Sequence, residues 1–295
     1  MSQDLKQALF GVFDAVQKNA IKLDFGADPE PGEAGQSRLG GRPDVPRDFE
    51  WPRFQDKDDD SADANRPLTF LAQVNLADAT RYDAEGLLPT AGVLSFFYEM
   101  ETQEWGFDPR DKGSARVFFF EDPATLRPAS VPDDLDDWFP DGQAISYRNM
   151  VDLPAWLGFT ELPEEVRRTN PLPVPLTDIE WEDYDAMREE YGAPSEGDDA
   201  VTTKLLGHPD VVQNPMEAEC EMVTRGMADG AEGEEISQEL RDDIEKASRD
   251  WTLLFQMGTD SGLEFGDVGH INYWIKKQDL ARRDFDKAWL ILQCG

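Results

Sequence analysis

The first apolar positions of the chain recur at three- and four-residue steps, a pattern that predicts an amphipathic helix over residues 5–23. The next segment, residues 24–65, is rich in glycine, proline and acidic residues, and it ends in DKDDDSADAN at 56–65. We expect this segment to be irregular and its end to be a solvated acidic loop. The apolar stripe of the helix consists of Leu5, Leu9, Val12, Phe13, Val16 and Ala20.

Short apolar runs, bounded by turn residues, predict strands in two groups of three. An acidic, proline-rich middle region over 123–250 separates the groups. This region carries a predicted strand at 143–147 and predicted helices at 163–168, 181–191 and 237–246. The six runs are 68–76, 92–98 and 116–121 in the first group, and 251–257, 270–275 and 288–293 in the second.

The two groups of strands resemble each other. When residues 68–74 are laid on 251–257, Thr69 falls on Thr252 and Gln73 on Gln256. Either the chain contains an internal duplication, with half-repeats at about 66–122 and 250–294, or any two three-stranded antiparallel units look this similar. We expect one α+β domain over residues 1–295, with mostly antiparallel sheets, peripheral helices and long acidic loops.

Distinctive motifs occur along nearly the whole chain. They are SRLGGRP at 37–43, WP at 51–52, PLTFLAQVNL at 67–76, LLGHP at 205–209 with Gln213, FGDVGHINYWI at 265–275 and FDKAW at 285–289. In these motifs and their order the chain resembles the YwqG-like family, also called the domain of unknown function 1963. The resemblance implies an α+β fold and carries no established biochemical activity. Some relatives are encoded beside bacterial toxin systems, which implies an immunity or binding role.

The net charge of the chain limits the classes of partner that it can bind. With 62 acidic and 28 basic side chains, the net charge is −34. Such a charge repels nucleic-acid phosphates and anionic membranes, so we expect neither as a partner, whereas a basic protein such as a toxin would be attracted. The alternative is that the acidity only keeps the protein soluble. No secretory signal or membrane-length apolar stretch is found, so we expect a soluble, cytoplasmic protein.

The sequence offers little for metal or disulfide chemistry. Its two cysteines, Cys220 and Cys294, form no C-x-x-C pair, and its two histidines are His208 and His270. We therefore expect no disulfide framework, no metal site and no cofactor.

The glycine-rich stretch with Arg38, Gly40, Gly41 and Arg42 has two interpretations. Adjacent glycines can turn backbone N–H groups toward a phosphate, and the arginines would add positive charge. However, the Gly-Lys-Ser/Thr sequence of a nucleotide-binding loop is absent, and the prolines that follow prevent a helix. A rigid turn that delivers Trp51 to the core is the favoured interpretation.

Polar residues inside apolar segments are the other candidates. Gln73 and Gln256, at matching positions, are expected to hold neighbouring loops by hydrogen bonds, with a ligand contact as the alternative. His208 and Asp210 could form a general-base pair, or Asp210 could cap a short helix. Asp267 is interpreted as a turn residue.

These observations support two hypotheses about function. The first is a non-enzymatic protein-binding module with an acidic surface. The second is a small-ligand binder or an enzyme, with a site between the two sheet units. The residues expected to form that candidate cleft are Arg38, Gly40, Gly41, Arg42, Gln73, His208, Gln256 and Asp267.

Overall fold

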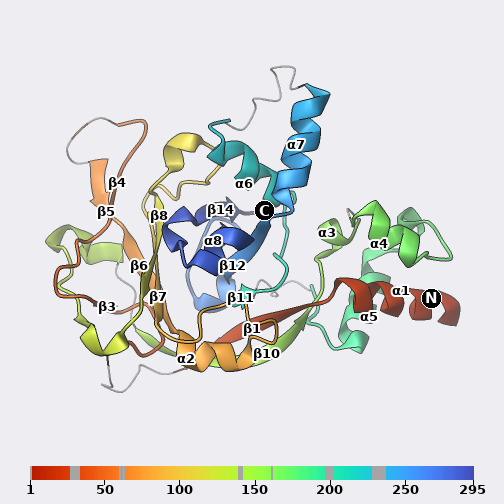
Figure 1. The fold of residues 1–295 in the computed structure, drawn as a ribbon, viewed down its shortest axis with the longest axis horizontal. Helices are drawn as coiled ribbons and strands as arrows, with labels where there is room; N and C mark the ends of the chain where they lie inside the picture. Colours follow the sequence, from red (N-terminus) through yellow and green to blue (C-terminus); the bar gives the residue numbers. More distant parts are fainter. Residues whose placement is uncertain are drawn as a thin grey trace.

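Ten strands join in one antiparallel sheet, in the order β14-β13-β12-β11-β1-β10-β2-β6-β7-β8 (Figure 1). The computed structural model describes residues 2–26, 34–59, 61, 64–138, 142–160, 162–196, 202–227 and 237–295; residues 60, 62 and 63 of the predicted acidic loop lie outside these ranges. The strands are β1 (Lys18–Phe25), β2 (Arg38–Leu39), β6 (Thr69–Asn75), β7 (Val93–Tyr98), β8 (Ala115–Phe120), β10 (Gln143–Asp152), β11 (Lys204–Leu206), β12 (Trp251–Met257), β13 (His270–Lys276) and β14 (Trp289–Gln293).

The sheet divides into two halves of five strands each, and the strands of the two halves correspond in order from each edge to the centre. The first half is β8-β7-β6-β2-β10 and the second is β14-β13-β12-β11-β1. Each half exchanges one strand with the other: β1 precedes β2 in the chain but pairs with β11, and β10 precedes β11 but pairs with β2. The exchanged strands pair with each other along their length, from Lys18–Asp152 to Phe25–Ile145. The two halves are therefore interlocked.

The main apolar core lies between the inner faces of the two halves. The rings of Phe96 on β7 and Phe255 on β12 are 4.3 Å apart between centroids. Tyr273 on β13 donates a hydrogen bond from its hydroxyl group to the carbonyl of Phe97, at 2.9 Å. The curved sheet thus buries one face against itself, while the outer faces carry the loops that cover them.

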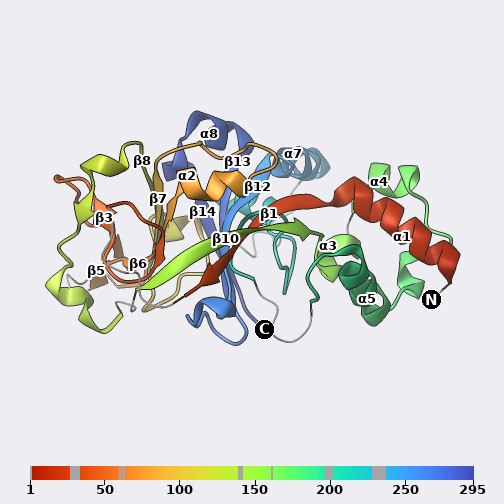
Figure 2. The same ribbon diagram turned by 90° about the horizontal axis from the view of Figure 1, so that it is seen from below.

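Four helices form a separate lobe at the end of the sheet where Lys18 and Asp152 lie (Figure 2). They are α1 (Gln3–Val16), α3 (Trp156–Thr160), α4 (Glu164–Thr169) and α5 (Trp181–Tyr191). The lobe has its own core, in which Phe13, Phe159 and Tyr184 make ring contacts. None of the described helices is long and apolar enough to cross a membrane.

The remaining elements are short and surround the sheet. Helix α2 (Leu76–Ala79) follows β6, α6 (Glu217–Thr224) and α7 (Gln238–Ser248) precede β12, and α8 (Lys277–Arg282) follows β13. Two small hairpins complete the structure: β3 (Asp44–Val45) with β9 (Arg127–Pro128), and β4 (Arg53–Gln55) with β5 (Asn65–Pro67). Short 3₁₀ turns, among them Pro109–Asp111 and Thr259–Ser261, lie in the connections.

The α+β class with a large antiparallel sheet is confirmed. The six strands predicted in two groups are β6, β7, β8, β12, β13 and β14, and the strand predicted at 143–147 is the first half of β10. The predicted helices at 163–168, 181–191 and 237–246 are α4, α5 and α7. The predicted helix over 5–23 is wrong beyond Val16, because residues 18–25 form β1. This segment has a strand on each side, so long-range pairing outweighs its helical period.

Candidate functional site

A buried polar motif holds the glycine-rich loop of the first half against β6. The side-chain amide of Gln73 accepts a hydrogen bond from the Asp44 backbone N–H at 2.8 Å. It also donates to the Asp44 carboxylate at 2.9 Å and to the Gln36 carbonyl. Arg38 completes the motif with an ion pair to Asp44 at 2.7 Å. Gln73 and Asp44 are almost fully buried. Because Gln73 bonds to backbone groups of both Gln36 and Asp44, it holds the loop at its two ends.

The second half carries the same motif in other residues. Gln256 accepts from the Asp210 N–H at 2.8 Å and donates to the Asp210 carboxylate at 2.6 Å and to the Thr202 carbonyl at 2.7 Å. Lys204 takes the place of Arg38, with its ammonium group 2.8 Å from Asp210. The prediction that both glutamines hold neighbouring loop backbone is confirmed.

The two motifs also match along the chain. SRLGGRPD at 37–44 aligns with TKLLGHPD at 203–210, without a gap. The hydroxyl oxygens of Ser37 and Thr203 accept hydrogen bonds from equivalent backbone N–H groups, at 2.8 and 3.0 Å. The donors are Asn75, the last residue of β6, and Gly258, the residue after β12. Gly41 and Gly207 both have a positive φ, of 71° and 82°. The two motifs therefore match in sequence and in geometry, while an internal duplication with half-repeats at about 66–122 and 250–294 stays a prediction.

The second motif has an additional acid, Asp152 at the end of β10. Its carboxylate lies 3.0 Å from the Lys204 ammonium group and accepts a hydrogen bond from the His208 N–H at 2.8 Å. Burial raises the pKa of Asp152 in spite of the nearby lysine. Burial acts in the same direction on Asp210, but Lys204 outweighs it and lowers the pKa of that carboxyl. Lys204 therefore lies between two carboxylates that differ in proton affinity.

The structure separates His208 from Asp210 and so corrects the general-base alternative. The His208 ring bonds to the carbonyl of Val16 at 2.7 Å, whereas Asp210 bonds to Lys204, Gln256 and the backbone N–H of Thr202. Burial lowers the pKa of His208 well below its usual value. Asp210 therefore neither orients this imidazole nor caps a helix.

The predicted cleft residues lie in three places. Arg38, Gly40, Gly41, Arg42 and Gln73 belong to the first-half motif, whose loop leaves Arg42 exposed. His208 and Gln256 belong to the second half. Asp267 is exposed on a turn, and its backbone carbonyl accepts a hydrogen bond from the Gly295 N–H. The apolar core lies between the inner faces of the two halves. A ligand contact by any of these residues stays a prediction.

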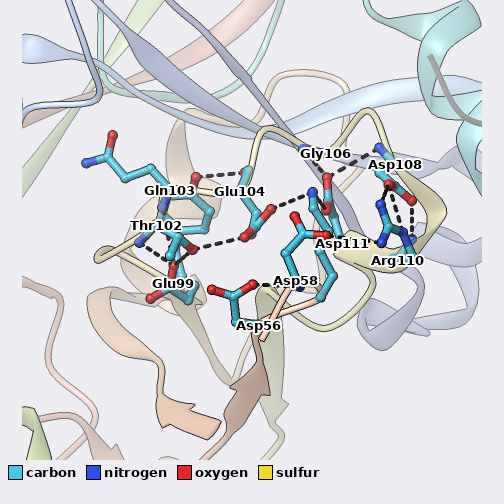
Figure 3. Close-up of polar contacts among 12 residues, drawn as sticks. Asp56, Asp58, Glu99, Thr102, Gln103, Glu104, Gly106, Asp108, Arg110 and Asp111 are labelled. Carbon is cyan, nitrogen blue, oxygen red and sulfur yellow. Dashed lines mark hydrogen bonds and ion pairs between the residues drawn. The ribbon is translucent and has the colours of Figure 1, made fainter. Parts of the chain in front are cut away.

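A third polar network holds the long connection between β7 and β8 (Figure 3). Lys57, from the β4–β5 hairpin, forms ion pairs with Glu104 and Asp111. Although burial alone would lower it, hydrogen bonds to these two acids raise the pKa of Lys57 to about 12. Asp111 also accepts from the backbone N–H of Gly106, at 3.0 Å. The network is internally paired and fixes a loop, and no group of three or more described His, Cys, Asp or Glu residues is placed to hold a metal ion.

Sequence reasoning missed Asp44, Lys204 and Asp152. The first two could have been found, because the alignment of residues 37–44 with 203–210 pairs Arg38 with Lys204 and Asp44 with Asp210. Asp152 has no such signal. It reaches Lys204 only because β10 lies beside β1, which pairs with β11.

The family comparison includes both motifs. The model described as "Domain of unknown function (DUF1963)" matches residues 37–294. The chain belongs to this family. The match begins at Ser37 and so spans both polar motifs of the DUF1963 chain, but it leaves out α1 and β1. No curated protein matches the chain.

Proposed function

We propose that this DUF1963 protein is a binding protein that engages a positively charged partner protein through its acidic surface. The observation that carries the proposal is that the acidic charge stays at the surface. Among the described residues only six carboxylates and three cations are buried, and the buried cations Lys204, Arg188 and Lys22 are paired with carboxylates of the same chain. Most of the net charge of −34 therefore faces solvent.

Helix α5 is the surface that fits such a partner best. Its only cation, Arg188, is buried, whereas Glu182 and Glu189 are exposed one above the other, seven residues apart. Trp181 is partly exposed at the start of the same helix, as is Leu157 on α3. Large aromatic side chains are common at the energetic centre of protein interfaces, and charge of one sign near them steers an oppositely charged partner.

The test starts with capture of the partner from the native host and its identification by mass spectrometry. The purified partner is then titrated against the DUF1963 protein. We expect a basic protein in a one-to-one complex, with an association rate that falls as NaCl is raised. The double variant Glu182→Lys/Glu189→Lys should lower the association rate about tenfold or more, since it replaces attraction by repulsion.

The matched control is Glu239→Lys/Asp242→Lys on α7, which changes the net charge equally. We expect a much smaller effect there, because these residues are exposed on a different helix. Equal effects of the two double variants would show that α5 is not the contact surface. Absence of any stoichiometric basic partner would contradict the proposal as a whole.

A further inference from the structure

Small-ligand binding, the second kind of function that the sequence predicts, has a candidate in a hollow that both halves line, although none of the predicted cleft residues belongs to its described lining. The hollow has a volume of about 600 Å³, within the usual size of small-molecule sites. The first half contributes the loop 85–90, and the second half contributes β1, β12 and the helix α8. Among the second-half residues are Lys18, Lys277, Leu280, Ala281 and Arg283.

The charge of this hollow is opposite to that of the protein. Its described lining has three cations, Lys18, Lys277 and Arg283, and one acid, Glu85. The whole chain has more than twice as many acidic as basic side chains. Remote carboxylates are screened over about 8 Å at physiological salt, so a ligand in the hollow responds mainly to the lining. The hollow therefore favours an anion on an otherwise acidic protein.

Two of these cations have no carboxylate partner within the described part of the chain. The Lys18 ammonium group is 3.5 Å from the Gly207 carbonyl, and Lys277 donates to the Arg249 carbonyl at 2.8 Å. Burial lowers the pKa of Lys18, and the positive charge of Lys277 acts in the same direction, against Glu217, Asp152 and Glu85. A bound anion would reduce this repulsion between the two lysines.

Unlike the two lysines, Arg283 has a carboxylate partner, but the ion pair between them is open to solvent. Its ion pair with Glu121 is 3.3 Å long, and both side chains are more than half exposed. Such pairs contribute little to stability, so the guanidinium group can exchange this carboxylate for a ligand at small cost. Apolar surface completes the lining, including Leu87, which is 40% exposed.

We propose that this hollow binds a small phosphorylated molecule. The phosphate group would lie against Lys18, Lys277 and Arg283, because a doubly charged group with three acceptor oxygens can be shared by two ammonium groups and a guanidinium group. The organic part of the ligand would lie on Leu87, Leu280 and Ala281. This site and the α5 surface have no residue in common, so either can fail without the other.

The test uses phenyl phosphate as the probe, titrated into the full-length protein by calorimetry. Inorganic phosphate and phenol, titrated separately, isolate the charged and the apolar parts. We expect phenyl phosphate to bind more tightly than inorganic phosphate and to raise the melting temperature, and we expect no binding of phenol. Lys277→Ala and Arg283→Ala should each weaken binding roughly tenfold, the loss expected for one charge-assisted contact.

Two further variants make the result decisive. Lys246→Ala removes an exposed lysine on α7, outside the hollow, and should leave binding unchanged. Glu85→Gln removes the one acid of the described lining and should tighten binding. The proposal is overturned if phenyl phosphate does not bind at about 10 mM, a level that detects even very weak sites. It is also overturned if Lys246→Ala weakens binding as much as Lys277→Ala does.

Discussion

At the scale of single residues, the outer face of the second half contains a buried histidine. His270 lies on β13 with no exposed surface, and neither ring nitrogen has a hydrogen-bond partner among the described residues. Burial lowers its pKa to about 4, with Lys204 acting in the same direction and Asp210 against it. His270 is therefore neutral in the folded protein at neutral pH.

This predicts a loss of stability in mild acid. Between pH 6.5 and about 4 the unfolded chain takes up a proton at this position and the folded chain does not, so the free energy of unfolding falls as the pH is lowered. The contribution of His270 is at most about 3 kcal/mol. The variant His270→Leu should unfold with a flatter pH dependence, measured by denaturant titration at several pH values. Parallel curves for the two proteins would show that His270 does not titrate in this way.

At the scale of elements, residues 206–210 form a strap that continues from β11 and ends at Asp210, whose carboxylate pairs with Lys204 of that strand. It begins with two residues of positive φ, Leu206 and Gly207. A side chain at Gly207 would place its Cβ 2.2 Å from the Asp152 carboxylate and 2.7 Å from the Ala20 Cβ. The strap can follow this path only with glycine at residue 207, because it passes directly over β10 and β1.

Substitution of Gly207 should therefore lower the free energy of unfolding by more than its positive φ alone explains. Gly226→Ala is the matched control, since Gly226 has a φ of 87° and nothing within 4 Å of an added Cβ. We expect Gly226→Ala to lower the free energy of unfolding by about 1 kcal/mol, from backbone strain alone. Gly207→Ala should lower it by roughly 3 kcal/mol or more, from strain and steric overlap. Equal losses in denaturant titration would contradict the tight packing of the strap.

At the scale of the whole molecule, the exchange of β1 and β10 makes each half depend on the other. The central position of β1 is filled by residues that precede the family match. Ala20, Ile21 and Leu23 of this strand are fully buried. Without β1, both β10 and β11 would lose a neighbour on one side, leaving unpaired backbone groups and an open core.

Two deletions test this dependence. Removal of residues 1–36 should abolish cooperative thermal unfolding, although it leaves the whole of the family match in place. Removal of residues 1–15 takes away most of α1 but keeps β1, so the sheet should still melt cooperatively while the helical lobe loses packing. The measurement is melting followed by circular dichroism in the near and far ultraviolet. Cooperative melting of the shorter chain, 37–295, would show that β1 is dispensable.

The elements that depend on neighbours along the chain could be read from the sequence. The six outer strands, α4, α5 and α7 follow from local alternation, periodicity and turn residues, and Trp51 reaches the core as expected, donating to the Leu68 carbonyl at 2.9 Å. Gln73 and Gln256 were found as a matched pair because they lie in those strands. The polar motifs around them were only half visible, since their acids and cations lie in loops with no regular pattern.

The sequence by itself determined the α+β class, the family and the similarity of the two groups of strands. Only the tertiary structure decided that residues 18–25 form a strand, that β1 and β10 change places, and that Asp152 joins Lys204. The physical reason is distance along the chain: β1 pairs with residues about 120 and 180 positions away. The same applies to the cationic hollow, whose lysines, arginine and covering loop come from three separate parts of the chain.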